Sequence, residues 1–170
     1  LHVYRACAYD EFGRSAEAIA DLDAALTLAP SGTVAVLALI TLAFVRDREG
    51  DAEGAFAAVA RALALDPADR EAHAALGTLL AWHGAYPRAW SELEFHHLDE
   101  RARYRKRFPD LHEWNGEPIA AQRLLVVHGQ GLGDLLQCVR YVPRLRERCA
   151  HLTLECAEPL VSLLRASGVD

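Results

Sequence analysis

The spacing of apolar residues changes along the chain near residue 108. Up to that point the sequence is rich in alanine, and its apolar residues follow helical patterns. The longest apolar stretch runs from Val34 to Val45 and is interrupted only by Thr41. A stretch of about 12 residues is too short to span a bilayer, which takes roughly 20, so it predicts a buried helix of a globular protein.

After residue 122 the pattern predicts a strand, a helix, a second strand and a second helix. The apolar run LLVVH after Arg123 is typical of a strand that is buried on both faces of a parallel sheet. Apolar residues at helical spacing follow at Leu135, Cys138, Val139, Val142 and Leu145. HLTLEC then alternates like a strand, and Pro159 can open a helix over 160–166 that Gly168 ends. This order predicts a right-handed crossover between two parallel strands, the start of a doubly wound α/β domain.

The first hundred residues repeat a pattern anchored on glycine. Gly13, Gly50 and Gly84 are each followed five residues later by alanine, at Ala18, Ala55 and Ala89. Gly50 and Gly84 are 34 residues apart, whereas Gly13 and Gly50 are 37 apart, which indicates a three-residue insertion around 31–33. Small residues at fixed positions let two antiparallel helices approach closely, and glycine permits the tight turn between them.

These units resemble the tetratricopeptide repeat, a helix–turn–helix unit of 34 residues. The residues that carry the resemblance are Ala6, Tyr9, Gly13, Ala18, Leu22, Ala25 and Pro30, then Ala43, Gly50, Ala55, Val59, Ala62 and Pro67, then Leu76, Gly77, Gly84, Ala89 and Leu93. The third unit has His96 where alanine is expected and Arg101 where proline is expected, so its second helix is expected to run on as a cap or connector. The resemblance implies an α-helical solenoid of about three repeats over 1–101.

Two interpretations of the repeats remain open: a concave peptide-binding surface, or a scaffold without a ligand of its own. Trp82, Tyr86 and Trp90 fall within one repeat, and aromatic residues at helical spacing are more often core than binding site. Residues 102–122 read as a linker that packs in part, because FPDLHEWNGEPIAAQ has no helical period. Residues 123–170 are then the incomplete beginning of a Rossmann-like domain.

The stretch HGQGLGD at 128–134 follows the first predicted strand, where glycines bring backbone close to a ligand. The dinucleotide pattern G-x-G-x-x-G fails, because Asp134 or Gln137 occupies the place of the third glycine. The nucleotide-binding pattern that ends in Gly-Lys-Ser/Thr is missing too. Neither a nicotinamide nor a flavin cofactor is therefore expected.

The second half resembles the heptosyltransferase-like glycosyltransferases of the GT-B fold, which follow tetratricopeptide arrays in some bacterial proteins. The matching residues are Trp114, Gly116, Glu117 and Pro118, then Gln130, Gly131, Leu132, Gly133, Asp134, Gln137, Arg140, Tyr141 and Pro143, then Leu154, Glu155, Pro159 and Leu160. The resemblance implies a Rossmann-like half that holds an acceptor, while a second half holds the nucleotide-sugar donor. This sequence has Gly129 where the family often has an acidic residue, so no carboxylate role is assigned there.

The resemblance makes Asp134 the candidate catalytic base, because glycosyl transfer requires a base for the acceptor hydroxyl. The alternative is that Asp134 only caps the helix. Gly131 and Gly133 are the candidate positions for close approach of a ligand, or else form a tight turn. Gln130 and Arg140 are further candidate ligand-binding residues, for a sugar hydroxyl and an anion. The nucleotide-sugar is expected as a substrate, with no cofactor and no metal site.

The net charge and the cysteine spacing exclude some classes of ligand. A net charge of −6 argues against general binding of nucleic acid. The basic segment 101–107 is either an anion site or a solvated helix end.

The cysteines and histidines indicate neither disulfides nor a metal site. The four cysteines lack C-x-x-C spacing, so we expect them to be reduced and to pack as small apolar residues. His96 and His97 point too far apart on a helix to bind one metal ion together. Without a secretion signal, we expect a cytoplasmic protein with a protein or glycan acceptor on the repeats and no membrane span.

Two functions therefore follow from the sequence. In the first, the intact protein transfers a sugar from a nucleotide-sugar to an acceptor. In the second, it is a non-catalytic repeat scaffold for protein–protein interaction. Because the chain starts at Leu1 and stops just after Gly168, we expect a fragment at both ends. A fragment that lacks half of the cleft is expected to show no transferase turnover.

Overall fold

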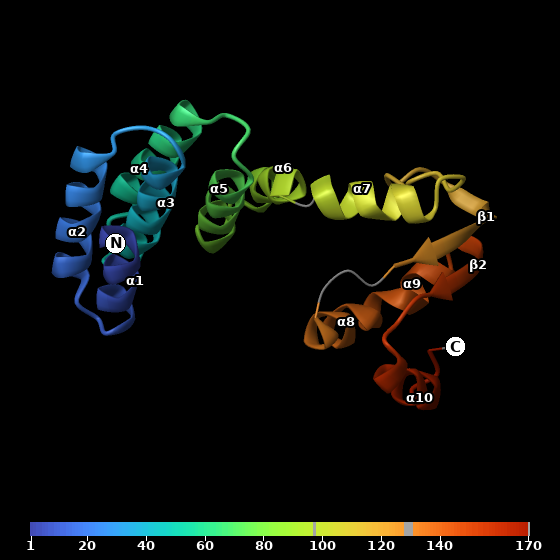
Figure 1. The fold of residues 1–170 in the computed structure, drawn as a ribbon. Coiled ribbons are helices and arrows are strands. Elements are labelled where there is room, and N and C mark those ends of the chain that lie inside the picture. Colours follow the sequence, from blue (N-terminus) through green and yellow to red (C-terminus); the bar gives the residue numbers. More distant parts are fainter. Residues whose placement is uncertain (97, 128–130, 170) are drawn as a thin grey trace. The chain divides into compact units, whose positions relative to one another are not determined.

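The computed structural model describes residues 1–96, 98–127 and 131–169 of the chain. The chain divides into two compact units, Leu1–Tyr104 and Arg105–Asp170. The described residues are mostly helical, with a small two-stranded parallel sheet in the second unit (Figure 1).

The first unit is a series of antiparallel helix pairs (Figure 1). Its helices are α1 (His2–Glu11), α2 (Ser15–Leu28), α3 (Thr33–Arg48), α4 (Ala52–Leu65), α5 (Arg70–Trp82) and α6 (Tyr86–His96). The pairs are α1 with α2, α3 with α4 and α5 with α6. The first helices of successive pairs also contact each other, α1 with α3 and α3 with α5. The predicted helical hairpins are therefore present in the order that the sequence indicates.

Glycine makes the turn inside each pair. Gly13, Gly50 and Gly84 have φ values of 70°, 84° and 78°, in the left-handed region that a side chain disfavours. Five residues later, each second helix buries its alanine almost completely against the first helix. The sequence prediction of a turn glycine followed by a small contact residue is confirmed at these positions.

Among the described helices, α3 contributes the most buried residues to the core of the first unit. This helix buries eight residues, including Leu39, Leu42 and Val45, as its apolar pattern predicts. No helix in the described parts of the chain combines the length and the apolar character that crossing a bilayer requires.

An ion pair and a hydrogen bond connect one helix pair to the next at the ends of their first helices. Asp10 of α1 pairs with Arg48 of α3, and Asp47 of α3 accepts from His83 Nε2 just after α5 at 2.7 Å. Asp10 and Asp47 stand at the same position in successive repeats. Equivalent aspartates of successive repeats therefore make the polar contacts between neighbouring helix pairs.

The aromatic cluster of the third pair is exposed, so the prediction that it belongs to the core is wrong. Trp82, Tyr86 and Trp90 are 62%, 58% and 64% exposed. Trp82 contacts only the edge of Phe44 among the described aromatic rings, with ring centroids 5.8 Å apart. Trp82 ends α5 whereas Tyr86 and Trp90 belong to α6, so the three residues do not share the face of one helix, and α5 buries alanine and leucine side chains instead.

A further helix, α7 (Leu98–Arg107), carries the basic segment. Its arginines pair with carboxylates: Arg101 with Glu94 at 3.7 Å, Arg105 with Glu113 at 2.9 Å and Arg107 with Glu155 at 2.6 Å. Most of this positive charge is thus balanced within the protein, which favours the helix-end interpretation over an anion site.

In the second unit, β1 (Ile119–Val126) pairs in parallel with β2 (Cys149–Leu154). The parallel pairing is confirmed, with Arg123 opposite His151 and Val126 opposite Leu154. The strand begins at Ile119, four residues before the predicted start, and its residues 120–123 are exposed. The predicted strand stretch, residues 124–127 as far as the structure describes it, is only half-buried, so the prediction of a strand buried on both faces is wrong. The reason is that β2 is the one strand that pairs with β1 among the described residues.

The predicted single helix after the glycine loop is interrupted. It consists of α8 (Leu132–Cys138), a 3₁₀ turn η1 (Val139–Tyr141) and α9 (Val142–Arg146). Pro143 has no N–H, and its ring conflicts with the carbonyl of Val139 in a continuous α-helix, so the backbone tightens there. The last helix, α10 (Glu158–Ala166), has Pro159 in its first turn and is followed by Gly168 at φ 75°, as predicted.

A small apolar core joins α8 to α10. Leu135, Leu160 and Leu164 are buried together, and Leu154 of β2 packs against them. Cys138 is exposed, and so is Cys7 in the first unit, so these two thiols do not have the apolar environment that the sequence suggested.

Candidate functional site

The candidate site is the segment between β1 and α8. β1 ends at Val126, and α8 begins at Leu132 with Gly131 as its N-terminal capping residue. The segment therefore starts at the carboxyl end of a parallel strand, where α/β sheets bind ligands. Gln130, a predicted ligand-binding residue, lies outside the described residues, as do His128 and Gly129.

Gly131 and Gly133 are exposed, and neither needs to be glycine for the backbone. Gly131 has φ −64° and ψ 164°, which any residue can adopt. Gly133 lies in the first turn of α8, and a Cβ added there would meet no atom within 4 Å. A tight turn therefore does not account for these glycines, and Gly133 leaves open space above the backbone.

Asp134 is exposed and is turned toward its own helix start. Its Oδ2 accepts a hydrogen bond from the Gly131 N–H at 3.1 Å. Because Gly131 has no side chain, this is the half of a capping box that the pair can form. The carboxylate thus has an observed capping contact, while its second oxygen, Oδ1, has no protein partner in the described residues.

Arg140 and Tyr141 lie in the 3₁₀ turn after α8. The Arg140 guanidinium is 5.1 Å from the centre of the Tyr141 ring, within the range of a cation–π contact. Both side chains are exposed, Tyr141 to 47%. Arg140 therefore rests on its neighbour and has no carboxylate partner among the described residues.

Two apolar side chains at this site were not predicted as ligand-binding residues from the sequence, although Leu132 is one of the residues of the resemblance. Leu132 and Leu136 are 45% and 42% exposed, and they lie one turn apart on the same face of α8. Leu132 and Leu136 lie three residues before and one residue after Leu135, so the apolar spacing alone did not mark these two leucines as exposed. They give the glycine segment an apolar edge of the kind that contacts the carbon face of a ligand.

The WNGEP segment has a structural explanation. The Trp114 indole N–H donates to the Glu117 carbonyl at 2.7 Å, and the Asn115 N–H donates to the Glu117 carboxylate at 2.8 Å. Gly116 has φ 96°. The backbone N–H groups of Glu117 itself and of Asn115 lower the pKa of the Glu117 carboxyl. These residues of the resemblance form a closed turn before β1, so they need no ligand to explain them.

In the residues that the structure describes, no three histidine, cysteine or acidic side chains are placed to hold a metal ion. The side chain of His96 and all of His97 are outside the description. No protein-family model matches the chain, and no curated protein matches it.

Proposed function

We propose that this chain belongs to a sugar-transferring protein. In this proposal, tetratricopeptide-type repeats precede the Rossmann-like start of a GT-B glycosyltransferase. The segment Gly131–Asp134 lines the acceptor side of the cleft, and a nucleotide-sugar bound mainly by a second half donates the sugar. The order of helical hairpins and then a parallel β–α–β–α unit supports this arrangement.

The observation that carries the proposal is the open space at Gly133. A glycine in the middle of a helix costs about 0.5–1 kcal/mol relative to alanine when nothing requires it, and Gly133 is the second residue of α8. The backbone at Gly133 would accept alanine, and nothing in the described structure occupies the space of the methyl group. Close approach of a ligand is the physical reason that favours glycine there.

Asp134 has two proposed roles that its geometry permits together. The oxygen Oδ2 holds the start of α8, while Oδ1 is available to take the proton of an acceptor hydroxyl. Fixing one oxygen by a backbone N–H orients the other, which a base that acts on a bound hydroxyl requires.

Binding of saccharides to this chain tests the proposal. Glucose, galactose, mannose and N-acetylglucosamine, their 1-phosphates, and UDP-, GDP- and ADP-sugars would be titrated into ¹⁵N-labelled protein. We expect at least one of them to shift the amide resonances of Gly131 and Gly133. Gly133→Ala should preserve the circular dichroism spectrum and weaken that binding about tenfold, whereas Ser162→Ala, an exposed change on α10, should not. If none of the compounds shifts these amides at about 10 mM, the proposal fails.

The substitution Asp134→Asn distinguishes a role of Asp134 as general base from its role as helix cap. Asparagine keeps an oxygen that accepts from the Gly131 N–H, so fold and saccharide binding should persist. In a polypeptide that also contains the donor-binding half, loss of a general base should reduce transfer by about 10²-fold or more. Unchanged transfer would show that Asp134 is only a cap.

A specific observation also favours the second function, a scaffold for protein partners. Trp82 at the end of α5 and Tyr86 and Trp90 of α6 are each more than half exposed, so most of their aromatic surface is not used by the core. Exposed tryptophan and tyrosine are enriched at protein interfaces. Triple substitution of these residues to alanine should leave the core of the helix pairs intact and abolish partner binding under this function.

A further inference from the structure

The boundary between one helix pair and the next uses equivalent positions of the second helices. The fifth residues of α2, α4 and α6 are Ile19, Phe56 and Trp90. Ile19 and Phe56 are half-buried and pack against the core of the first unit, where α2 contacts α3 and α4 contacts α5. Trp90, at the same position of the third pair, is 64% exposed. The third pair therefore leaves open the surface with which the first two pairs contact their successors.

The residue that directly follows each first helix receives this contact. These residues are Phe12 after α1, Glu49 after α3 and His83 after α5. Ser15 Oγ of the first pair donates to the Glu49 carboxylate at 2.7 Å, and the Phe56 ring of the second pair has its centroid 5.5 Å from that of the His83 ring. Phe12, at the same position of the first pair, is 82% exposed.

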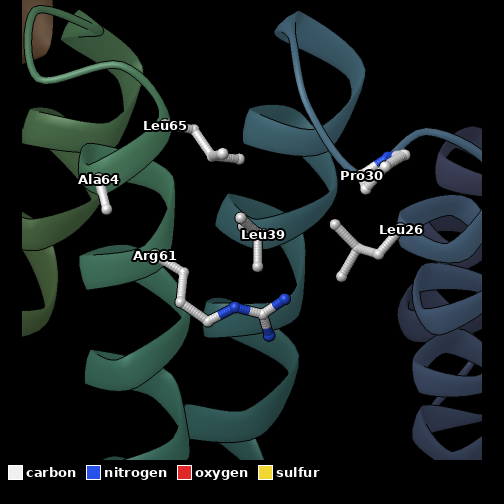
Figure 2. A pocket seen from close by; sticks show the side chains of 6 residues that line it. All are labelled: Leu26, Pro30, Leu39, Arg61, Ala64 and Leu65. Carbon is white, nitrogen blue, oxygen red and sulfur yellow. The ribbon is translucent and has the colours of Figure 1, made fainter.

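The boundary between the first two pairs is less closely packed at its other end. Figure 2 shows a hollow of about 250 Å³ near the carboxyl ends of α2 and α4, lined by Leu26, Pro30, Leu39, Arg61, Ala64 and Leu65. Its central residue, Leu39, is only 1% exposed, so the hollow is too shallow to enclose a side chain. The end beside the glycine turns is therefore the part of the boundary that specifies how pairs join.

The two exposed surfaces complement each other. Tyr86 is the first residue of α6, as Ser15 is of α2, and Tyr86 is 58% exposed. Two aromatic rings, Tyr86 and Trp90, are thus exposed on α6, and a third, Phe12, is exposed at the end of α1. Aromatic pairs contribute about 0.5–1.5 kcal/mol beyond the burial of their area. After α6 the described chain continues as α7 and the second unit, so no fourth helix pair in this part of the chain covers α6.

We infer that copies of this chain associate head to tail, with α6 of one copy packed on the end of α1 in the next. Tyr86 and Trp90 of one copy contact Phe12 of the other, as equivalent positions do between successive pairs within the chain. Because the two surfaces differ, a dimer leaves one of each free, and association continues as concentration rises. These residues all belong to the first unit, so the inference does not depend on the function proposed for Gly131–Asp134.

Analytical ultracentrifugation of the whole chain tests this association at concentrations from about 5 to 500 μM. For a contact with a Kd of about 100 μM, we expect a weight-average mass close to the monomer at the lowest concentration and above the dimer at the highest. A chain that stays monomeric throughout, or whose mass stops at a dimer, would overturn the inference.

Substitution of one surface at a time makes the test specific. Phe12→Gln and Trp90→Gln should each weaken association about thirtyfold. An equimolar mixture of the two variants should form a 1:1 dimer and no larger assembly, because each variant keeps the surface that the other lacks.

The matched control is Leu28→Gln, which changes an apolar residue of α2 that is 74% exposed and lies at neither position. It should associate like the unmodified chain. Circular dichroism confirms that each variant is folded. Association that survives either Phe12→Gln or Trp90→Gln, or a mixture that stays as monomeric as the separate variants, would contradict a head-to-tail contact.

Discussion

Asp21 is the one buried charged residue among those that the structure describes, and it holds the first two helices together. It lies on α2 and is 7% exposed. Arg5 of α1 donates to both of its carboxylate oxygens at 2.5 Å, and His2 Nδ1 lies 3.0 Å from Oδ1. A bidentate arginine satisfies a carboxylate in the fixed geometry that stabilises the charged form.

The pH dependence of this contact follows from the direction in which the pKa of the Asp21 carboxyl is shifted. The Arg5 hydrogen bonds, followed by that of His2, hold the pKa of the Asp21 carboxyl well below its usual range. The folded state therefore favours the ionised form, so the stabilisation is complete above the unfolded pKa of about 4 and is lost as pH falls through the folded value. We expect Asp21→Asn to lower the Tm of the first unit at pH 7 and the difference to shrink below about pH 4.

Thermal unfolding followed by circular dichroism between pH 2.5 and 7 measures this effect. Asp23→Asn, an exposed change two residues along α2, is the matched control and should shift the Tm little at any pH. A Tm difference for Asp21→Asn that is equal at pH 7 and pH 2.5 would show that the ionised carboxylate is not what stabilises the hairpin.

At the scale of elements, a single proline divides one predicted helix into three pieces. The apolar spacing from Leu135 to Leu145 was correctly interpreted as helical, and Leu135 and Val142 are indeed buried. Apolar spacing carries no information about the backbone, whereas Pro143 removes an N–H donor and its ring crowds the preceding turn. The 3₁₀ turn that results carries Arg140 and Tyr141, two residues of the resemblance.

Replacing this proline should restore a continuous helix. In Pro143→Ala the restored N–H can donate to the Val139 carbonyl, so we expect α8 and α9 to merge and the helical signal at 222 nm to increase slightly. Removing a proline from a helical segment changes stability by up to about 3 kcal/mol where the proline strains it. Slower amide exchange at residues 139–143 would support the prediction, and an unchanged spectrum and exchange pattern would contradict it. Pro159→Ala, in the first turn of α10, is the control and should extend nothing.

At the scale of the whole molecule, each compact unit has its own core. One core gathers α1 to α5 around Leu39, Leu42 and Val59, and the other joins Leu135 to Leu160 and Leu164. The two cores share no residue, so damage to one should not be transmitted through the packing of the other.

Overpacking of the first core tests this independence. Ala55 is fully buried where α4 crosses α3, so Ala55→Leu adds volume to a site without free space. We expect a loss of about 1–3 kcal/mol in the free energy of unfolding of the first unit. Hydrogen exchange read by mass spectrometry should show faster exchange in α2 to α5, with Leu135 and Leu160 to Leu164 unchanged. Ala57→Leu, at an exposed position of α4, is the control and should cost little. Equal loss of protection in both units would contradict separate cores.

The candidate site could be predicted only in part. The strand, the glycine segment and the following helix were located from the sequence, because each has a local signature in spacing or residue type. The direction of the Asp134 carboxylate toward the Gly131 N–H was one of two alternatives that the sequence left open. The open space at Gly133 depends on which side chains approach from elsewhere, and no local pattern specifies that.

The sequence by itself determined the helix pairs, their glycine turns, their buried alanines and the parallel order of the two strands. These features follow from backbone conformation and from periodicity, which act over a few residues. Only the tertiary structure decided that Trp82, Tyr86 and Trp90 are exposed, that β1 is exposed at residues 120–123 and only half-buried at residues 124–126, and that Arg61 borders an apolar hollow. Those outcomes depend on contacts between residues distant in the chain, and the same apolar spacing is compatible with burial against a neighbour or exposure to a partner.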